Sequence, residues 1–114
     1  MVETPDEPKV VLIISSDRGL CETMNKVVVR AKCHAVAVPD CGAADEALTT
    51  LRPVLILVDP LLRYELSSDL RAVCSVVEIP VRTSRSGVRR MAKPSTEAVR
   101  WLTDIVAERC VASH

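Results

Sequence analysis

The stretch VLILVDP at residues 54–60 decides the fold class of this chain. Its five consecutive aliphatic residues, Val54 to Val58, predict a β-strand that is buried on both faces. Asp59 and Pro60 end that strand. Strands of this kind belong to parallel sheets with helices on both sides, and ligands bind at the carboxyl edge of such sheets. Asp59 is therefore a candidate site residue from pattern alone.

On either side of this stretch, short aliphatic runs alternate with segments of helical spacing. The pattern predicts strands at 10–14, 34–38, 54–58, 79–83 and 88–92. It predicts helices at 20–31, 43–51, 66–77 and from residue 96, the last one capped by Ser95. This order is typical of an α/β fold with a doubly wound, five-stranded parallel sheet.

Length and composition indicate one domain. Of the 114 residues, we expect 1–8 to be a disordered lead-in, 9–111 the domain and 112–114 a tail. A formal net charge of zero provides no global attraction to nucleic acid or anionic membranes. No apolar run approaches the ~20 residues of a membrane span, and the acidic start is no secretion signal. We expect a cytoplasmic protein without membrane or nucleic-acid partners.

Five cysteines stand at positions 21, 33, 41, 74 and 110, without a C-x-x-C pair. An odd number without metal-ligand spacing argues against a zinc site or a complete disulfide framework. We expect reduced thiols that pack as small hydrophobic side chains.

Polar side chains follow several predicted strands at the edge where ligands bind. They are Ser15, Ser16 and Asp17 after the first strand, Asp59 after the third, Thr83 and Ser84 after the fourth, and Lys93 after the fifth. Because the carboxyl ends of parallel strands meet at one edge, we expect these groups to gather there.

An aliphatic strand ending in a single Asp, an Ile-Pro-Val run ending in Thr83 and Ser84, and the pair Lys93-Pro94 resemble the receiver domain of two-component response regulators. The resemblance extends from Lys9 to about Cys110. It implies a flavodoxin-like fold and a cis bond before Pro94. It also implies that Asp59 accepts a phosphoryl group from a histidine kinase or phosphotransfer protein. Lys93 and either Thr83 or Ser84 would then contact the phosphoryl oxygens.

The acidic pair that follows the first strand in this family falls on Ser15 and Ser16 here. Only Asp17, one place further along, is acidic. Magnesium prefers carboxylate and other hard oxygen ligands. Asp17 and Asp59 therefore predict a weak magnesium site, and no cofactor is required.

Two further departures concern the second half of the chain. Arg90 stands where receivers usually carry an aromatic switch residue, so the usual coupling of phosphorylation to output has no carrier. Nine residues separate Thr83 from Lys93 and must include a strand, whereas an average helix alone takes about 11. We expect the fourth helix to be missing or reduced to a loop, which leaves an apolar patch of sheet for a partner.

The resulting function hypothesis is a stand-alone atypical receiver that signals through protein–protein contact, with weak or absent phosphorylation of Asp59. It would not be an enzyme beyond self-phosphorylation and dephosphorylation. The expected partner is a histidine kinase or another response regulator, with a homodimer left open. Interface candidates are Trp101, Arg89 and Arg90.

Two functional alternatives stay open. One is a working phosphoacceptor that uses Asp59, and the other is binding of a phosphate-bearing messenger, such as a cyclic dinucleotide, by the basic run Arg82 to Lys93. Structural interpretations stand beside both. Asp59 with Pro60 forms a common turn pair, and the arginines suit a solvated loop.

Overall fold

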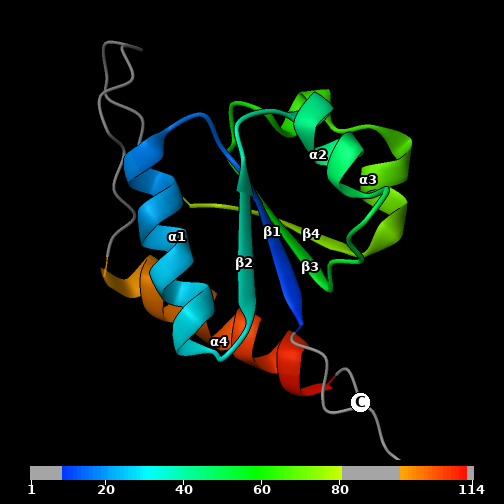
Figure 1. Ribbon diagram of the computed structural model, residues 1–114. Helices are drawn as coiled ribbons and strands as arrows, with labels where there is room; N and C mark the ends of the chain where they lie inside the picture. The colour runs from blue at the N-terminus through cyan, green and yellow to red at the C-terminus, as the bar shows by residue number, and fades with distance from the viewer. Residues whose placement is uncertain (1–8, 81–95, 113–114) are drawn as a thin grey trace, which may run out of the picture.

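The computed structural model of the chain is an α/β fold, described over residues 9–80 and 96–112 (Figure 1). Its described strands are β1 (Val10–Ile14), β2 (His34–Val38), β3 (Leu55–Val58) and β4 (Ser75–Glu78). Its described helices are α1 (Arg18–Arg30), α2 (Cys41–Ala47), α3 (Ser68–Val73) and α4 (Thr96–Ala112), with a 3₁₀ turn η1 (Arg63–Glu65). The arrangement is compatible with a flavodoxin-like fold.

The described strands form one parallel sheet in the order β2-β1-β3-β4. Within it, Ile14 pairs with Val38 on one side and with Val58 on the other. The inner strands β1 and β3 therefore end at the same level. This register places the residues that follow them, Ser15 and Asp59, side by side at the carboxyl edge.

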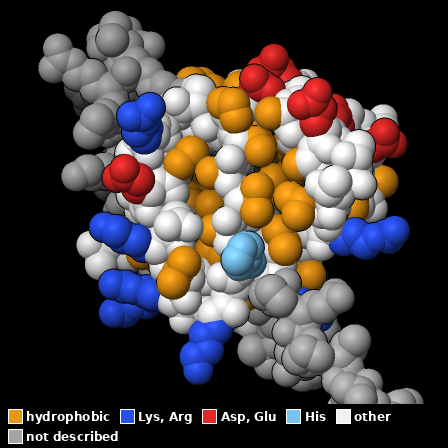
Figure 2. Space-filling model, viewed as in Figure 1, with side chains coloured by type: hydrophobic (Ala, Val, Ile, Leu, Met, Phe, Trp, Pro, Cys, Tyr) orange, Lys and Arg blue, Asp and Glu red, His pale blue; other side chains and the backbone are white. Residues whose placement is uncertain are grey.

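Helices cover both faces of the sheet (Figure 1). Because side chains alternate along a strand, β1 sends Val11 and Ile13 into one core cluster, which also contains residues of α1 and α4. It sends Leu12 and Ile14 into the other, with residues of α2 and α3. Every residue of β3 is buried, as its aliphatic sequence predicts. The outer strand β2 is partly exposed, and apolar side chains appear over it between α1 and α2 in Figure 2.

Oxygen-bearing side chains begin three of the helices. Asp17 Oδ1 accepts a hydrogen bond from Leu20 N at the start of α1, and Asp40 and Ser67 cap α2 and α3 in the same way. Each cap satisfies a backbone N–H that has no partner within its helix. The helix predicted at 43–51 begins two residues earlier because Asp40 caps it, and it ends at Ala47.

The strand predicted at 79–83 is wrong. The observed strand is Ser75–Glu78, and the helix predicted to run to residue 77 ends at Val73. Val76 and Val77 favour a strand because they are β-branched, and they pack on opposite faces of the sheet. Val73, Cys74 and Val77 also match helical spacing, which short apolar runs cannot distinguish from a strand.

Several expectations lie outside the described residues. They include the strand at 88–92, the shortened crossover, the bond before Pro94, the cap Ser95 and the lead-in at 1–8. The structure therefore describes four of the five predicted strands, with the fourth displaced. Among the helices of residues 9–80 and 96–112, none combines the length and the apolar composition that crossing a membrane requires.

The expectation that all cysteines are reduced is wrong, because Cys33 is disulfide-bonded. Cys21, Cys41 and Cys74 are free thiols. A disulfide depends on two Cβ atoms lying about 4 Å apart in space, which sequence spacing does not reveal.

Candidate functional site

Ser15 and Asp59 form the centre of the candidate site at the carboxyl edge of the sheet. Ser15 is 2% exposed and Asp59 is 0% exposed, and they are the buried polar side chains of the described core. The backbone holds both residues through the sheet ladder. Ser15 N donates to Val38 O at 3.0 Å, and Asp59 N donates to Ile14 O at 2.9 Å. Their positions therefore follow from the register of β1 between β2 and β3.

Both carboxylate oxygens of Asp59 accept hydrogen bonds from neutral donors. The Ser15 hydroxyl donates to Oδ2 at 3.0 Å, and Leu61 N donates to Oδ1 at 3.0 Å. A buried carboxylate is costly unless donors compensate for the water it has lost. Bonds to an ionised acceptor are also stronger than neutral ones. These contacts stabilise the buried acid through the protein's own groups.

The Ser15 hydroxyl joins three segments, because it accepts as well as donates. It accepts a hydrogen bond from Asp17 N at 3.0 Å while it donates to Asp59. A carboxylate at position 15 could accept from the same backbone N–H, but it has no proton to donate to a second carboxylate at neutral pH. Ser15 therefore gives Asp59 a hydrogen bond that an ionised acid at position 15 could not donate.

Asp17 and Ser16 are the other residues predicted beside Asp59 after the first strand. Asp17 is the cap of α1 through its Oδ1, and Ser16 is exposed. Over residues 9–80 and 96–112, no three His, Cys, Asp or Glu side chains are grouped in a way that could hold a metal. Magnesium prefers hard oxygen ligands, and Asp59 and Asp17 are the carboxylates that the sequence predicts for it. The expected weak binding stays a prediction.

Asp59 also begins the turn after β3. Besides the bond from Leu61 N to its side chain, its carbonyl accepts from Leu62 N at 2.8 Å. An Asp that accepts from the backbone two residues ahead forms an Asx turn, and Pro60 suits the position after it. These two hydrogen bonds confirm the interpretation of Asp59 as a turn residue.

The described free thiols are poorly suited to nucleophilic chemistry. Burial raises the pKa of Cys21 above the ordinary value, although a hydrogen bond with Ser15 opposes the rise. Burial likewise raises the pKa of Cys74 to about 11. The pKa of Cys41 rises through burial and through the nearby carboxylates Glu65, Asp45 and Asp40. Because the thiolate is the reactive form, these cysteines stay protonated near neutral pH.

Two grooves lie on the α2 and α3 side of the sheet. One lies between α2 and α3 and has a volume of about 530 Å³. The other, of about 410 Å³, lies between the turn η1 and the end of β4, and its lining includes Val58 and Val76. At its rim, Arg63 pairs with Glu78 at 2.7 Å and lies 4.7 Å from the centre of the Tyr64 ring. Tyr64 is 78% exposed.

Trp101, the predicted interface residue on α4, is half exposed. Its neighbours Leu102 and Val106 are fully buried against α1 and the sheet. Trp101 therefore lies on the part of α4 that faces away from the core. The other predicted contacts, Thr83, Ser84, Arg89, Arg90 and Lys93, lie outside the described residues.

Sequence reasoning identified Ser15 and Asp59 but missed the bond between them. The available signal was the expected meeting of the carboxyl ends of the parallel strands at one edge, with a hydroxyl donor after the strand at 10–14 and an acid after the strand at 54–58. Comparison with known proteins adds no identification, because no family model, no curated protein and no solved structure matches the chain.

Proposed function

We propose that this chain is an atypical receiver domain that acts through protein–protein contact and takes up phosphate on Asp59 weakly or not at all. The observation that carries the proposal is the hydrogen bond from the Ser15 hydroxyl to the buried carboxylate of Asp59. In the family that the sequence resembles, an acid at this position would help to hold a cation. Here a neutral hydroxyl contacts the carboxylate directly.

Phosphoryl transfer to Asp59 requires a carboxylate oxygen that can reach the phosphodonor, together with a cation that balances the developing charge. The side chain of Asp59 has no exposed surface, and each of its oxygens accepts a hydrogen bond. Uptake would require opening the edge of the sheet so that the carboxylate can reach the phosphodonor, and this requirement slows the reaction.

Exposed apolar and aromatic surface supports the protein-contact part of the proposal. The groove over Val58 and Val76 has Tyr64 and Arg63 at its rim, and interfaces are enriched in tyrosine and arginine. Only nine residues separate Thr83 from Lys93, too few for a strand and a further covering helix. Trp101 presents a second exposed aromatic surface on α4.

The test is phosphorylation by a small phosphodonor. The purified chain is incubated with acetyl phosphate and magnesium, and intact mass reports any added phosphoryl group. We expect no appreciable uptake by the unaltered protein. The matched variant is Asp59→Asn, which removes the acceptor but keeps a similar shape. Rapid uptake that Asp59→Asn abolishes would refute the proposal.

A working phosphoacceptor is the second candidate function. The position of Asp59 at the carboxyl edge of an inner strand favours it, because this is where ligands bind in parallel sheets. A magnesium titration followed by NMR at Ser15, Asp17 and Asp59 distinguishes the two. Saturable shifts at millimolar magnesium favour the phosphoacceptor, and unchanged spectra favour the interaction module.

A further inference from the structure

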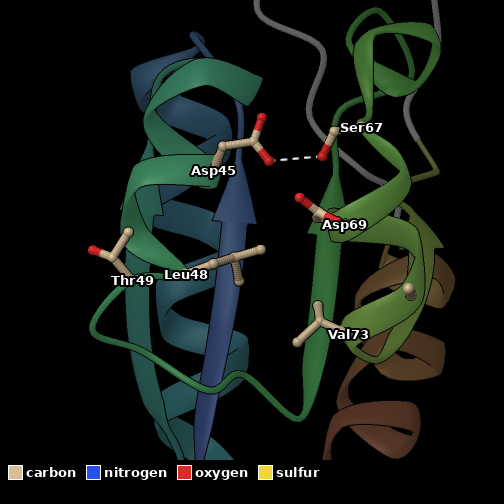
Figure 3. Close-up of a pocket in the computed structure, with 7 residues that line it drawn as sticks. Asp45, Leu48, Thr49, Ser67, Asp69 and Val73 are labelled. Atoms are coloured by element: carbon tan, nitrogen blue, oxygen red, sulfur yellow. Dashed lines mark hydrogen bonds between the residues drawn. The ribbon is translucent and has the colours of Figure 1, made fainter.

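The groove between α2 and α3 has an apolar floor and an acidic rim. We call it the α2–α3 groove, and its lining residues are Asp45, Leu48, Thr49, Ser67, Asp69, Ala72 and Val73. Figure 3 shows Leu48 and Val73 facing each other across the groove from opposite sides, with Asp45, Ser67 and Asp69 nearer one end. The lining thus combines aliphatic contact surface with carboxylates.

The apolar part of the α2–α3 groove joins the core below it. Leu48 is half-buried and packs against the core cluster on this face of the sheet. Val73 is 41% exposed, which is high for an aliphatic residue next to a core. A partner that covers Val73 would remove apolar surface from water and gain free energy in proportion to the area buried.

The charged part of the α2–α3 groove has one sign. Asp45 and Asp69 line it, and no Lys or Arg does. Further carboxylates lie near α2, since Asp40, Asp45 and Glu65 act together on the pKa of Cys41, while Arg63 and Arg71 line the neighbouring groove. Figure 2 shows acidic side chains over α2 and α3, whereas Lys and Arg lie mostly over the opposite side of the view. The groove therefore attracts positive charge.

A hydrogen bond joins the two walls of the α2–α3 groove. The Ser67 hydroxyl donates to Asp45 Oδ1 at 2.7 Å, and the same hydroxyl accepts from Leu70 N as the cap of α3. This contact links α2 to the first turn of α3 (Figure 3). A groove whose walls are already linked loses less conformational freedom when a partner binds.

From these observations we propose that the α2–α3 groove binds an amphipathic helix of a partner protein, with an aliphatic stripe flanked by Lys or Arg. The aliphatic stripe would cover Leu48 and Val73, and the basic residues would pair with Asp45 and Asp69. This is the helix-in-groove mode of recognition, with specificity supplied by complementary charge. The inference rests on the proposed function, since it names a surface and a partner chemistry for the interaction module.

The test uses the full chain labelled with ¹⁵N and an 18-residue amphipathic helical peptide of Leu and Lys. We expect NMR shift changes centred on Asp45, Leu48, Ser67 and Val73. We also expect binding to weaken as salt is raised, because the rim contacts are exposed ion pairs. A Leu and Glu peptide of the same pattern should leave these signals unchanged. Equal binding of both peptides, or shifts centred elsewhere, would overturn the inference.

The matched variants separate local charge from total charge. Asp45→Asn with Asp69→Asn removes both rim charges and keeps an oxygen that can accept from Ser67. We expect about tenfold weaker binding, as two exposed ion pairs would contribute. Glu22→Gln with Glu108→Gln makes the same change in net charge on α1 and α4, and it should leave binding unchanged. Equal effects of the two double variants would overturn the inference.

Two further outcomes are informative. Sedimentation of the chain without peptide tests for a second copy in the groove, and a dimer that Asp45→Asn with Asp69→Asn dissociates would overturn the proposal of a separate partner. Phosphate uptake by Asp59 would refute the proposed function without affecting peptide binding. If the chain takes up no phosphate and also fails to bind the Leu and Lys peptide, the result refutes this inference and leaves the proposed function standing.

Discussion

The hydroxyl of Ser15 donates a hydrogen bond of 3.0 Å to Oδ2 of Asp59, across a sequence separation of 44 residues. Each residue follows an inner strand of the parallel sheet, and each is almost fully buried. The bond links the ends of β1 and β3 and supplies a donor to an acid that has lost contact with water. It connects the stability of the sheet edge to the chemistry of the candidate site.

Replacing Ser15→Ala should destabilise the protein. Oδ2 of Asp59 loses a donor in a buried position, and Asp17 N loses an acceptor. Removing one partner of a buried hydrogen bond costs about 1–3 kcal/mol. Urea unfolding followed by circular dichroism measures the loss. Ser16→Ala is the matched control, because Ser16 is exposed and its loss should change stability by less than about 0.5 kcal/mol.

The variant Ser15→Asp should make stability depend on magnesium. A second carboxylate beside Asp59 creates like-charge repulsion in a buried place, which destabilises the folded state. A divalent cation that bridges the two carboxylates offsets this repulsion, and ligand binding to the folded state raises stability. Melting temperatures with and without millimolar magnesium provide the measurement.

The control for that experiment is Ser16→Asp, which adds the same charge at an exposed position. It should show little response to magnesium, as should the unaltered protein. If Ser15→Asp melts at the same temperature with and without magnesium, the site cannot recover a cation through this position alone.

Removing the cap of α1 with Asp17→Ala should cost about 1 kcal/mol. The Asp17 side chain accepts from Leu20 N, and the substitution leaves that backbone N–H without its partner. Urea midpoints again give the measurement. Asp17→Asn keeps the accepting oxygen and should recover most of the loss. Equal stability of Asp17→Ala and the unaltered protein would contradict the assignment of Asp17 as a structural cap.

The thiol of Cys74 should make folding less favourable at alkaline pH. Burial raises its pKa to about 11 from an ordinary value of 9.0, although Arg109 lowers it. Between these values the unfolded chain releases the proton while the folded chain retains it. Stability therefore falls as pH rises through this window.

Urea midpoints from pH 7 to 10.5 test this. Cys74→Ala and Cys74→Val should both show a shallower alkaline decline than the unaltered protein, whatever their stability at pH 7. Curves that stay parallel across the range would show that Cys74 does not titrate in this way.

The predicted elements succeeded where the sequence pattern had a single interpretation. The strands at 10–14 and 34–38 have the observed bounds, because each is an apolar run ended by polar or turn residues. The pattern failed at Val73 to Val77, where the spacing of apolar residues suits both a helix and a strand. In the structure, pairing with β3 decides the matter, since Ser75 to Glu78 lie opposite Leu55 to Val58.

The candidate site was predicted in its residues but not in its contacts. Ser15 and Asp59 could be placed at the same edge because parallel strands end together. The direction of the hydrogen bond, the burial of Asp59 and the capping role of Asp17 needed the packed structure. The disulfide at Cys33 was missed because it depends on distance in space.

The sequence by itself determined the fold class, the aliphatic strands and the residues that follow them. These properties are local, since they depend on the periodicity of apolar side chains and on where polar residues interrupt it. The tertiary structure alone decided that Ser15 satisfies Asp59, that β4 begins at Ser75, and that Asp45 and Asp69 share a groove. Each of these depends on register or packing between segments distant in the chain, which no local pattern specifies.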